Sequence, residues 1–138
     1  MERRTRILIV DDDAQVRRSL RSLVEGLGDV EVVAEAADGE AAIHAARLHR
    51  PDIALMDLTM PRLSGLEATA RMRHDAPDVR VIVVSIHNAD GYVQYALGAG
   101  ARGYVPKDAV SSELEPAIRA VARGDVYVAR REAGDGRS

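Results

Sequence analysis

The side chains with chemical potential in this sequence each follow an apolar segment of strand length. They are Asp11, Asp12 and Asp13 after the first such segment, Asp57 after the third, Ser85 at the end of the fourth, and Lys107 shortly after the fifth. If these segments form one parallel sheet, their carboxyl ends meet at one edge and the side chains converge there. Carboxylates about 4 Å apart repel by about 4 kcal/mol per pair at an effective dielectric of about 20. A cation must lie among them, and oxygen ligands without cysteine favour Mg²⁺ before Ca²⁺.

The aspartates differ in how well a purely structural role would explain them. An aspartate at a strand-to-helix junction commonly caps the helix, and we expect this of Asp13. A pair of further carboxylates at Asp11 and Asp12 brings no structural gain, since burying them costs free energy. Asp57 lies between apolar neighbours and has no solvated face. Asp11, Asp12 and Asp57 are therefore the candidates for chemistry.

Lys107 is the single lysine among 19 basic residues, and the others are arginine. A compact ammonium suits a phosphate or carboxylate partner in a narrow pocket better than a planar guanidinium does. The alternative is a surface lysine without a special role. Ser85 alone is uninformative, because a hydroxyl at a strand end is ordinary turn chemistry.

Apolar and amphipathic segments alternate five times along the chain. The expected strands are 6–10, 31–34, 53–56, 79–84 and 102–105, and the expected helices are 14–27, 39–50, 65–75, 89–97 and 113–123. Asp38 is placed to cap the second helix, and two sequences match the capping box, Ser64 with Glu67 and Ser112 with Glu115. Strands that are apolar on both faces and joined by helices predict a doubly wound α/β domain with a parallel sheet.

Composition limits the classes of protein that the chain can represent. With 138 residues, 46% of them hydrophobic, it can form one globular domain with its own core. The net charge of −3 offers no broad basic field for nucleic acid or anionic lipid. The lack of cysteine excludes a catalytic thiol, no apolar run is long enough to cross a membrane, and we expect a cytoplasmic location. We place the domain at 5–124 and interpret 125–138 as a C-terminal tail or the start of a linker.

Four motifs give the chain a recognisable resemblance. They are 7–13 (ILIVDDD), 53–61 (IALMDLTMP), 83–85 (VVS) and 100–108 (GARGYVPKD). In this order and spacing they resemble the receiver domain of bacterial two-component response regulators. The last motif, together with residues 117–125, is most similar to the NarL/LuxR-type subfamily, whose receivers precede a DNA-binding domain.

The resemblance implies a flavodoxin-like (βα)5 fold with a five-stranded parallel sheet in the order 2-1-3-4-5. It implies a signalling domain and not an enzyme, one that assists its own phosphoryl transfer and dephosphorylation and changes conformation to control an output. The expected output is transcription, through a DNA-binding domain absent from this chain. The partners it implies are a sensor histidine kinase and a homodimer formed on phosphorylation, with no membrane.

The resemblance also implies a role for each residue of the site. Asp57 would accept a phosphoryl group from a kinase phosphohistidine, and Mg²⁺ would be held by Asp11, Asp12, Asp57 and the backbone carbonyl of Thr59. Ser85 and Lys107 would contact phosphoryl oxygens, and Tyr104 would change rotamer as Ser85 moves. Thr59 and His87 would flank the phosphate. Because His87 stands where an acid or amide could position water, we expect slow self-dephosphorylation.

Three alternatives remain at this stage. Residues 7–13 also resemble the first motif of haloacid-dehalogenase-type phosphatases, in which Asp11 would be the nucleophile and Asp13 the general acid. A single-domain regulator could act through protein contacts alone. A receiver-like module that is never phosphorylated would be expected to lack one of Asp12, Asp57, Ser85 and Lys107, and this chain has all four.

Overall fold

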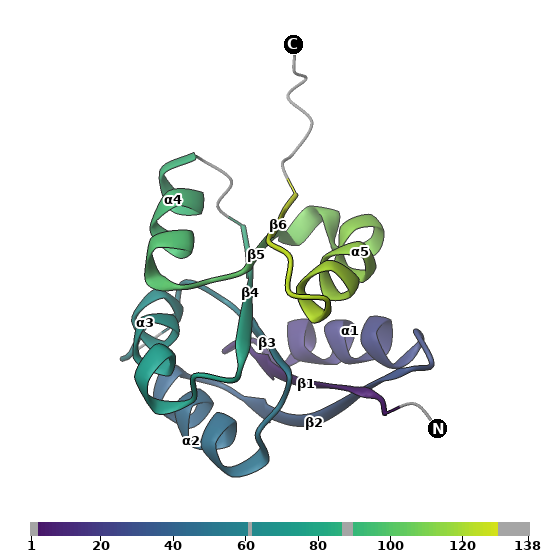
Figure 1. Cartoon of the computed structure of the whole chain (residues 1–138), viewed down its shortest axis with the longest axis horizontal. Helices are drawn as coiled ribbons and strands as arrows, with labels where there is room; N and C mark the ends of the chain where they lie inside the picture. The colour runs from purple at the N-terminus through teal and green to yellow at the C-terminus, as the bar shows by residue number, and fades with distance from the viewer. Residues whose placement is uncertain (1–2, 61, 87–89, 130–138) are drawn as a thin grey trace.

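The computed structural model describes residues 3–60, 62–86 and 90–129 of the chain. Six parallel strands form one sheet in the order β2-β1-β3-β4-β5-β6 (Figure 1). Their bounds are β1 Thr5–Val10, β2 Val30–Ala36, β3 Ile53–Met56, β4 Arg80–Ser85, β5 Gly103–Pro106 and β6 Tyr127–Val128. The doubly wound α/β architecture and the order of the first five strands are confirmed.

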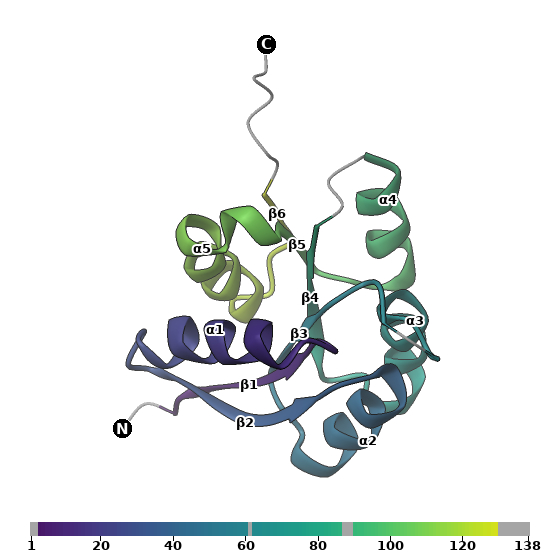
Figure 2. The ribbon, with the colours of Figure 1, turned by 180° about the vertical axis from the view of Figure 1, so that it is seen from behind.

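Helices cover both faces of the sheet. They are α1 Ala14–Glu25, α2 Gly39–His49, α3 Gly65–Asp75, α4 Asp90–Ala99 and α5 Val110–Ala122, and a short 3-10 turn, η1 Lys107–Ala109, precedes α5. Two opposite views place α1 and α5 on one face and α2, α3 and α4 on the other (Figures 1 and 2). None of the helices in the described part of the chain has the length and apolar character that crossing a membrane requires.

The strand alternation divides the core into two layers. Ile7 and Ile9 of β1 belong to the layer under α1 and α5, whereas Leu8 and Val10 belong to the layer under α2, α3 and α4. All four side chains are at most 1% exposed. Burial on both faces explains why the strands read as continuous apolar runs, and it leaves polar groups room only at the strand ends.

The sixth strand corrects the prediction of a five-stranded sheet. β6 pairs in parallel with β5, with Tyr127 opposite Gly103 and Val128 opposite Tyr104. The Tyr127 hydroxyl donates a hydrogen bond to the Glu113 carboxylate, and Ala129 is only 6% exposed. β6 lies after residue 124, where the sequence predicts the domain to end, and a strand of two residues is too short to show a periodicity.

The helix caps agree with the sequence at three of four positions. Asp13 accepts from the backbone N–H groups of Gln15 and Val16, Asp38 accepts from Ala41, and Ser64 forms the capping box with Glu67. The prediction that Ser112 caps the last helix was wrong. Helix α5 already begins at Val110, directly after η1, so Ser112 lies inside it and donates instead to the Ala109 carbonyl.

Gly65, the first residue of α3, lies against the strand end that carries Asp57. A Cβ atom at this position would lie 1.7 Å from the backbone oxygen of Asp57 and 2.9 Å from the Cα of Leu58. The Gly65 N–H also donates to the Leu58 carbonyl at 2.9 Å. Only a glycine lets α3 begin this close to the end of β3.

We therefore expect Gly65→Ala to lower the free energy of unfolding by about 2 kcal/mol or more, because the obstacle is backbone and cannot rotate away. Gly98→Ala is the matched control. A Cβ at Gly98, within α4, meets nothing within 4 Å, and the change should stabilise the protein by about 0.5–1 kcal/mol. Urea unfolding of both variants checks the pair, and equal stabilities would contradict the close approach.

Candidate functional site

The polar residues predicted to share one edge of the sheet do so. Asp11 follows the last residue of β1, Asp57 follows the last residue of β3, and Ser85 ends β4. The Asp57 N–H donates to the Val10 carbonyl at 2.9 Å, which holds the end of β3 beside the end of β1. Asp11, Asp57 and Ser85 are 1%, 4% and 1% exposed. The fold thus places polar groups from three strands in a buried position at the carboxyl edge.

Three carboxylates meet at this edge. Asp11, Asp12 and Asp57 each offer one oxygen, and these oxygens lie within 4.8 Å of one another. Asp11 and Asp57 are buried, whereas Asp12 is exposed and opens the cluster to solvent. Asp13, the fourth acidic residue considered, is committed to capping α1. The sequence-based division between Asp13 and the other aspartates agrees with this geometry.

Lys107 lies against the two buried carboxylates. Its Nζ is 2.9 Å from Asp11 Oδ2 and 3.4 Å from Asp57 Oδ1. Burial works against the charge of the ammonium, but the carboxylates of Asp11 and Asp57 outweigh it and raise the pKa of Lys107. The position of Lys107 at the start of η1, directly after β5, delivers the side chain to the edge.

One ammonium does not balance three carboxylates. Burial, followed by the charge of Asp11, raises the pKa of Asp57 from its ordinary 3.8 to about 6, although Lys107 acts in the opposite direction. The carboxylate of Asp57 is therefore held in a site that is short of positive charge. A divalent cation would supply it.

The residues present fit Mg²⁺. The donor set consists of carboxylate oxygens, which are the ligands that this hard cation prefers, and the exposed side at Asp12 leaves space for the water molecules that Mg²⁺ usually retains. Thr59 lies two residues after Asp57 and is exposed. The ligation by its backbone carbonyl stays a prediction.

Ser85 and Tyr104 form a second polar contact beside the carboxylates. Tyr104 is fully buried, and its side chain forms a hydrogen bond with that of Ser85. Burial raises the pKa of the Tyr104 phenol, so the ring stays neutral. The two residues lie on the neighbouring strands β4 and β5. His87, the other residue predicted to flank the site, lies outside the described residues.

One neighbour of the site was not identified from the sequence. Arg17, on the first turns of α1, donates from Nη1 to the backbone carbonyl of Asp11 at 2.7 Å. Its sequence neighbour is also an arginine, Arg18. The one signal that separates the two is position along the helix, because Arg17 comes four residues after the cap Asp13 and so lies on the same helix face as the cap.

Comparison with known proteins adds independent information. The family model described as the response regulator receiver domain matches residues 7–119. The transcriptional regulatory protein DegU of Brevibacillus brevis is 37% identical over 127 residues, which are 92% of this chain and 54% of that protein. The chain spans about half the length of the curated relatives it matches.

Solved structures agree with this match. A LuxR-family two-component response regulator from Aurantimonas sp. SI85-9A1 superposes with a TM-score of 0.86 at 39% identity, covering 90% of this chain and 89% of that one. The signal receiver domain of the NarL regulator from Mycobacterium tuberculosis gives a TM-score of 0.85 at 33% identity, covering 89% and 99%.

The raised pKa of Asp57 makes stability depend on pH in a defined direction. Between about pH 4 and pH 6 the folded protein binds a proton at Asp57 that the unfolded chain has lost, so stability falls as the pH rises through this window. In the metal-free protein, Asp57→Asn should therefore be stabilising by about 1–3 kcal/mol at pH 7.5 and by less at pH 4.5. Urea unfolding in the presence of EDTA measures both values.

The matched control is Asp78→Asn, at an exposed aspartate in the turn between α3 and β4. It should leave stability unchanged within about 0.5 kcal/mol at both pH values. An Asp57→Asn variant that is equally stabilised at pH 4.5 and pH 7.5 would refute the assignment of the effect to charge.

Proposed function

Since this chain belongs to the family of response regulator receiver domains, we propose that Asp57 is its phosphoryl acceptor. Receivers of the NarL/LuxR type are signalling domains under phosphorylation control, and in this chain that control acts through Asp57. The observation that carries it is the position of Asp57, which is buried beside Asp11 and 3.4 Å from the Lys107 ammonium.

The chemistry requires Asp57 as a carboxylate. With a pKa of about 6 it is ionised in most molecules at neutral pH, and a bound cation favours the ionised form further. An oxygen of Asp57 attacks the phosphorus of a phosphohistidine whose ring is protonated at its other nitrogen. The P–N bond breaks with its electron pair left on the nitrogen, so the kinase histidine leaves as the neutral imidazole. The product is an aspartyl phosphate. Catalysis of this kind rests on positioning and charge neutralisation.

The remaining residues hold and neutralise the transferred group. Mg²⁺, when bound, offsets the charge that spreads over the phosphoryl oxygens. Asp11, Asp12 and Asp57 would hold the ion, with the carbonyl of Thr59 as a further ligand. Lys107 already lies within reach of Asp57, so its ammonium can pair with a phosphoryl oxygen.

The conformational response starts at Ser85. The aspartyl phosphate adds up to two negative charges beside its hydroxyl, which now bonds Tyr104. A Ser85 hydroxyl that turns to a phosphoryl oxygen changes this contact, and the buried Tyr104 ring responds. A shift from 1:99 to 99:1 between two states takes about 5.5 kcal/mol, which a few charge-assisted hydrogen bonds can provide.

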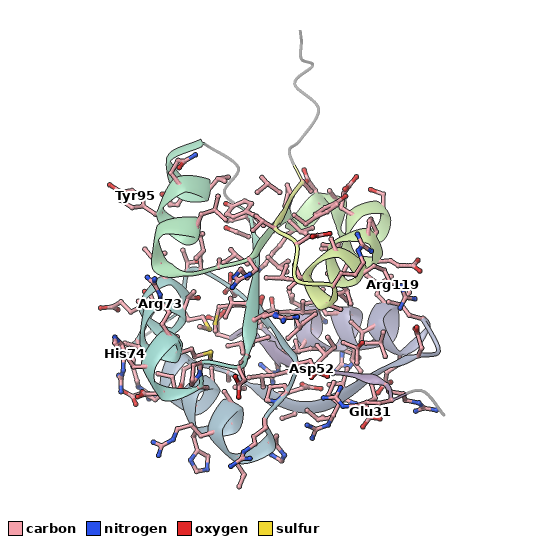
Figure 3. The ribbon with its side chains drawn as sticks, in the orientation of Figure 1. Glu31, Asp52, Arg73, His74, Tyr95 and Arg119 are labelled. Carbon is pink, nitrogen blue, oxygen red and sulfur yellow. The ribbon has the colours of Figure 1, made fainter. Side chains whose placement is uncertain are left out.

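Membership of the family supports the partners proposed for this chain. They are a sensor histidine kinase, a second copy of the chain on phosphorylation, and DNA through a C-terminal domain outside this chain, all in the cytoplasm. A single-domain regulator acting by protein contact remains the second candidate. One observation favours contact through α4, since Tyr95 projects from this helix and is 69% exposed (Figure 3).

The phosphatase alternative receives no support from the geometry. Its general acid would be Asp13, but that carboxylate accepts hydrogen bonds from two backbone N–H groups at the start of α1. Asp11, the nucleophile in that scheme, is engaged by Lys107 and by the N–H of Asp13. Asp57 would have no role in it.

Phosphorylation is tested by intact mass after incubation with acetyl phosphate and Mg²⁺. We expect a gain of one phosphoryl group that needs Mg²⁺ and is absent in Asp57→Asn, because Asp11, the other buried carboxylate beside Lys107, is engaged by the Lys107 ammonium at 2.9 Å and by the Asp13 N–H at 2.9 Å. Asp78→Asn should behave as the unmodified sequence does. A gain that survives Asp57→Asn would move the nucleophile to another residue, and no gain at all would favour a module that only binds partners.

The lifetime of the phosphorylated form is a separate prediction. We propose that the domain assists its own dephosphorylation only weakly, because the sequence has a histidine at position 87, where the resemblance implies that an acid or amide would position water. The half-life of the phosphorylated form should then be minutes or longer. His87→Asn should shorten it several-fold. His74→Asn, on the exposed surface of α3 (Figure 3), is the control. A half-life of seconds for the unchanged chain would overturn the proposal.

A further inference from the structure

The backbone that carries Asp11 and Asp12 is held by a side chain from α1. Arg17 Nη1 donates to the Asp11 carbonyl at 2.7 Å, while its Nε donates to Glu35 Oε1 at 3.0 Å. Glu35 lies near the end of β2, the strand next to β1. A single guanidinium thus bridges the acidic loop and the neighbouring strand, in the fixed geometry that arginine provides.

Glu35 is itself held in place. Arg21, one turn further along α1, donates from Nε to Glu35 Oε2 at 2.7 Å and from Nη1 to Glu25 at 2.9 Å. The hydrogen bond from Arg21, assisted by the one from Arg17, lowers the pKa of the Glu35 carboxyl. Arg17 is therefore anchored on one side by a carboxylate that both arginines keep charged.

The contact matters most for Asp12. The Asp11 side chain is fixed directly, since it accepts from the N–H of Asp13 at 2.9 Å and from Lys107 at 2.9 Å. The exposed Asp12 carboxylate has no hydrogen bond or ion pair with any residue in the described part of the chain. Its direction depends on the backbone before it, and the planar peptide between Asp11 and Asp12 is oriented through the Asp11 carbonyl.

We propose that Arg17 is a positioning residue of the metal site, which orients the peptide between Asp11 and Asp12 so that the Asp12 carboxylate joins Asp11 and Asp57 in holding a divalent cation. The inference rests on the function proposed above. It assigns to Arg17 a role that acts through the Asp11 carbonyl, without contact between Arg17 and the metal. Partners of this kind typically change metal affinity by 10- to 100-fold.

The sign of the effect separates positioning from plain electrostatics. Arg17 is a positive charge near an anionic cluster, so its removal should tighten cation binding if charge alone counts. If Arg17 orients the loop, its removal weakens binding instead. A general loss of stability would affect Arg17 and Arg21 variants alike, because both arginines bond Glu35.

The test is Mg²⁺ titration of the unphosphorylated chain, followed by the backbone amide NMR signals of residues 11–13 and 57. We expect Arg17→Gln to weaken Mg²⁺ binding roughly 10-fold. Arg21→Gln, which removes the same charge and leaves the Asp11 contact in place, should stay within about two-fold of the unchanged chain. Thermal unfolding in EDTA verifies that each variant is folded, and Arg17→Lys, which keeps the charge but not the bridge, serves if Arg17→Gln does not fold.

The same variants are then phosphorylated with acetyl phosphate over a range of Mg²⁺ concentrations. Arg17→Gln should raise the Mg²⁺ concentration for half-maximal rate and leave the rate at saturating Mg²⁺ nearly unchanged. Unchanged or tighter Mg²⁺ binding in Arg17→Gln, or equal weakening in Arg21→Gln, would overturn the inference and leave Asp57 phosphorylation standing. If the unchanged chain binds no Mg²⁺, the metal site and the role of Arg17 both fall.

Discussion

The structure depends on an imbalance of charge at one edge of the sheet. Three carboxylates approach within 4.8 Å, and the ammonium of Lys107 is the cation that lies against the two buried ones. Such a cluster raises the free energy of the folded state, and the raised pKa of Asp57 is the local sign of this cost. The apolar layers on both faces of the sheet compensate for it. The three carboxylates could therefore hold a cation, and the positive charge of that cation would attract an anionic group.

The strand ends could be placed from the sequence because one physical rule governs them. A strand buried on both faces excludes polar side chains until it ends, so Asp11, Asp57 and Ser85 mark the same edge in the sequence and in space. The cap at Ser64 is local and was equally predictable. Lys107 could be singled out because it is the one lysine of the chain, and it lies against Asp11 and Asp57.

The features that escaped prediction depend on contacts between distant segments. Strand β6 forms because Tyr127 and Val128 pair with the edge of β5. The identity of these two residues alone does not predict that pairing. Ser112 matches a capping box, but the turn at η1 starts α5 earlier than the motif implies. Arg17 bonds a carbonyl six positions earlier and a carboxylate on another strand, a pairing that requires the finished sheet.

The short strand β6 also determines what the sheet presents to other molecules. By pairing with β5 it removes a row of free backbone groups beside Tyr104, whose carbonyl accepts from the Ala129 N–H at 2.8 Å. The outermost strand on this side then has only two residues, and the opposite edge, β2, carries the charged side chains of Glu31 and Glu35. Short and charged borders disfavour the addition of a foreign strand. In the described part of the chain, both edges of the sheet are therefore poor templates for sheet-to-sheet aggregation.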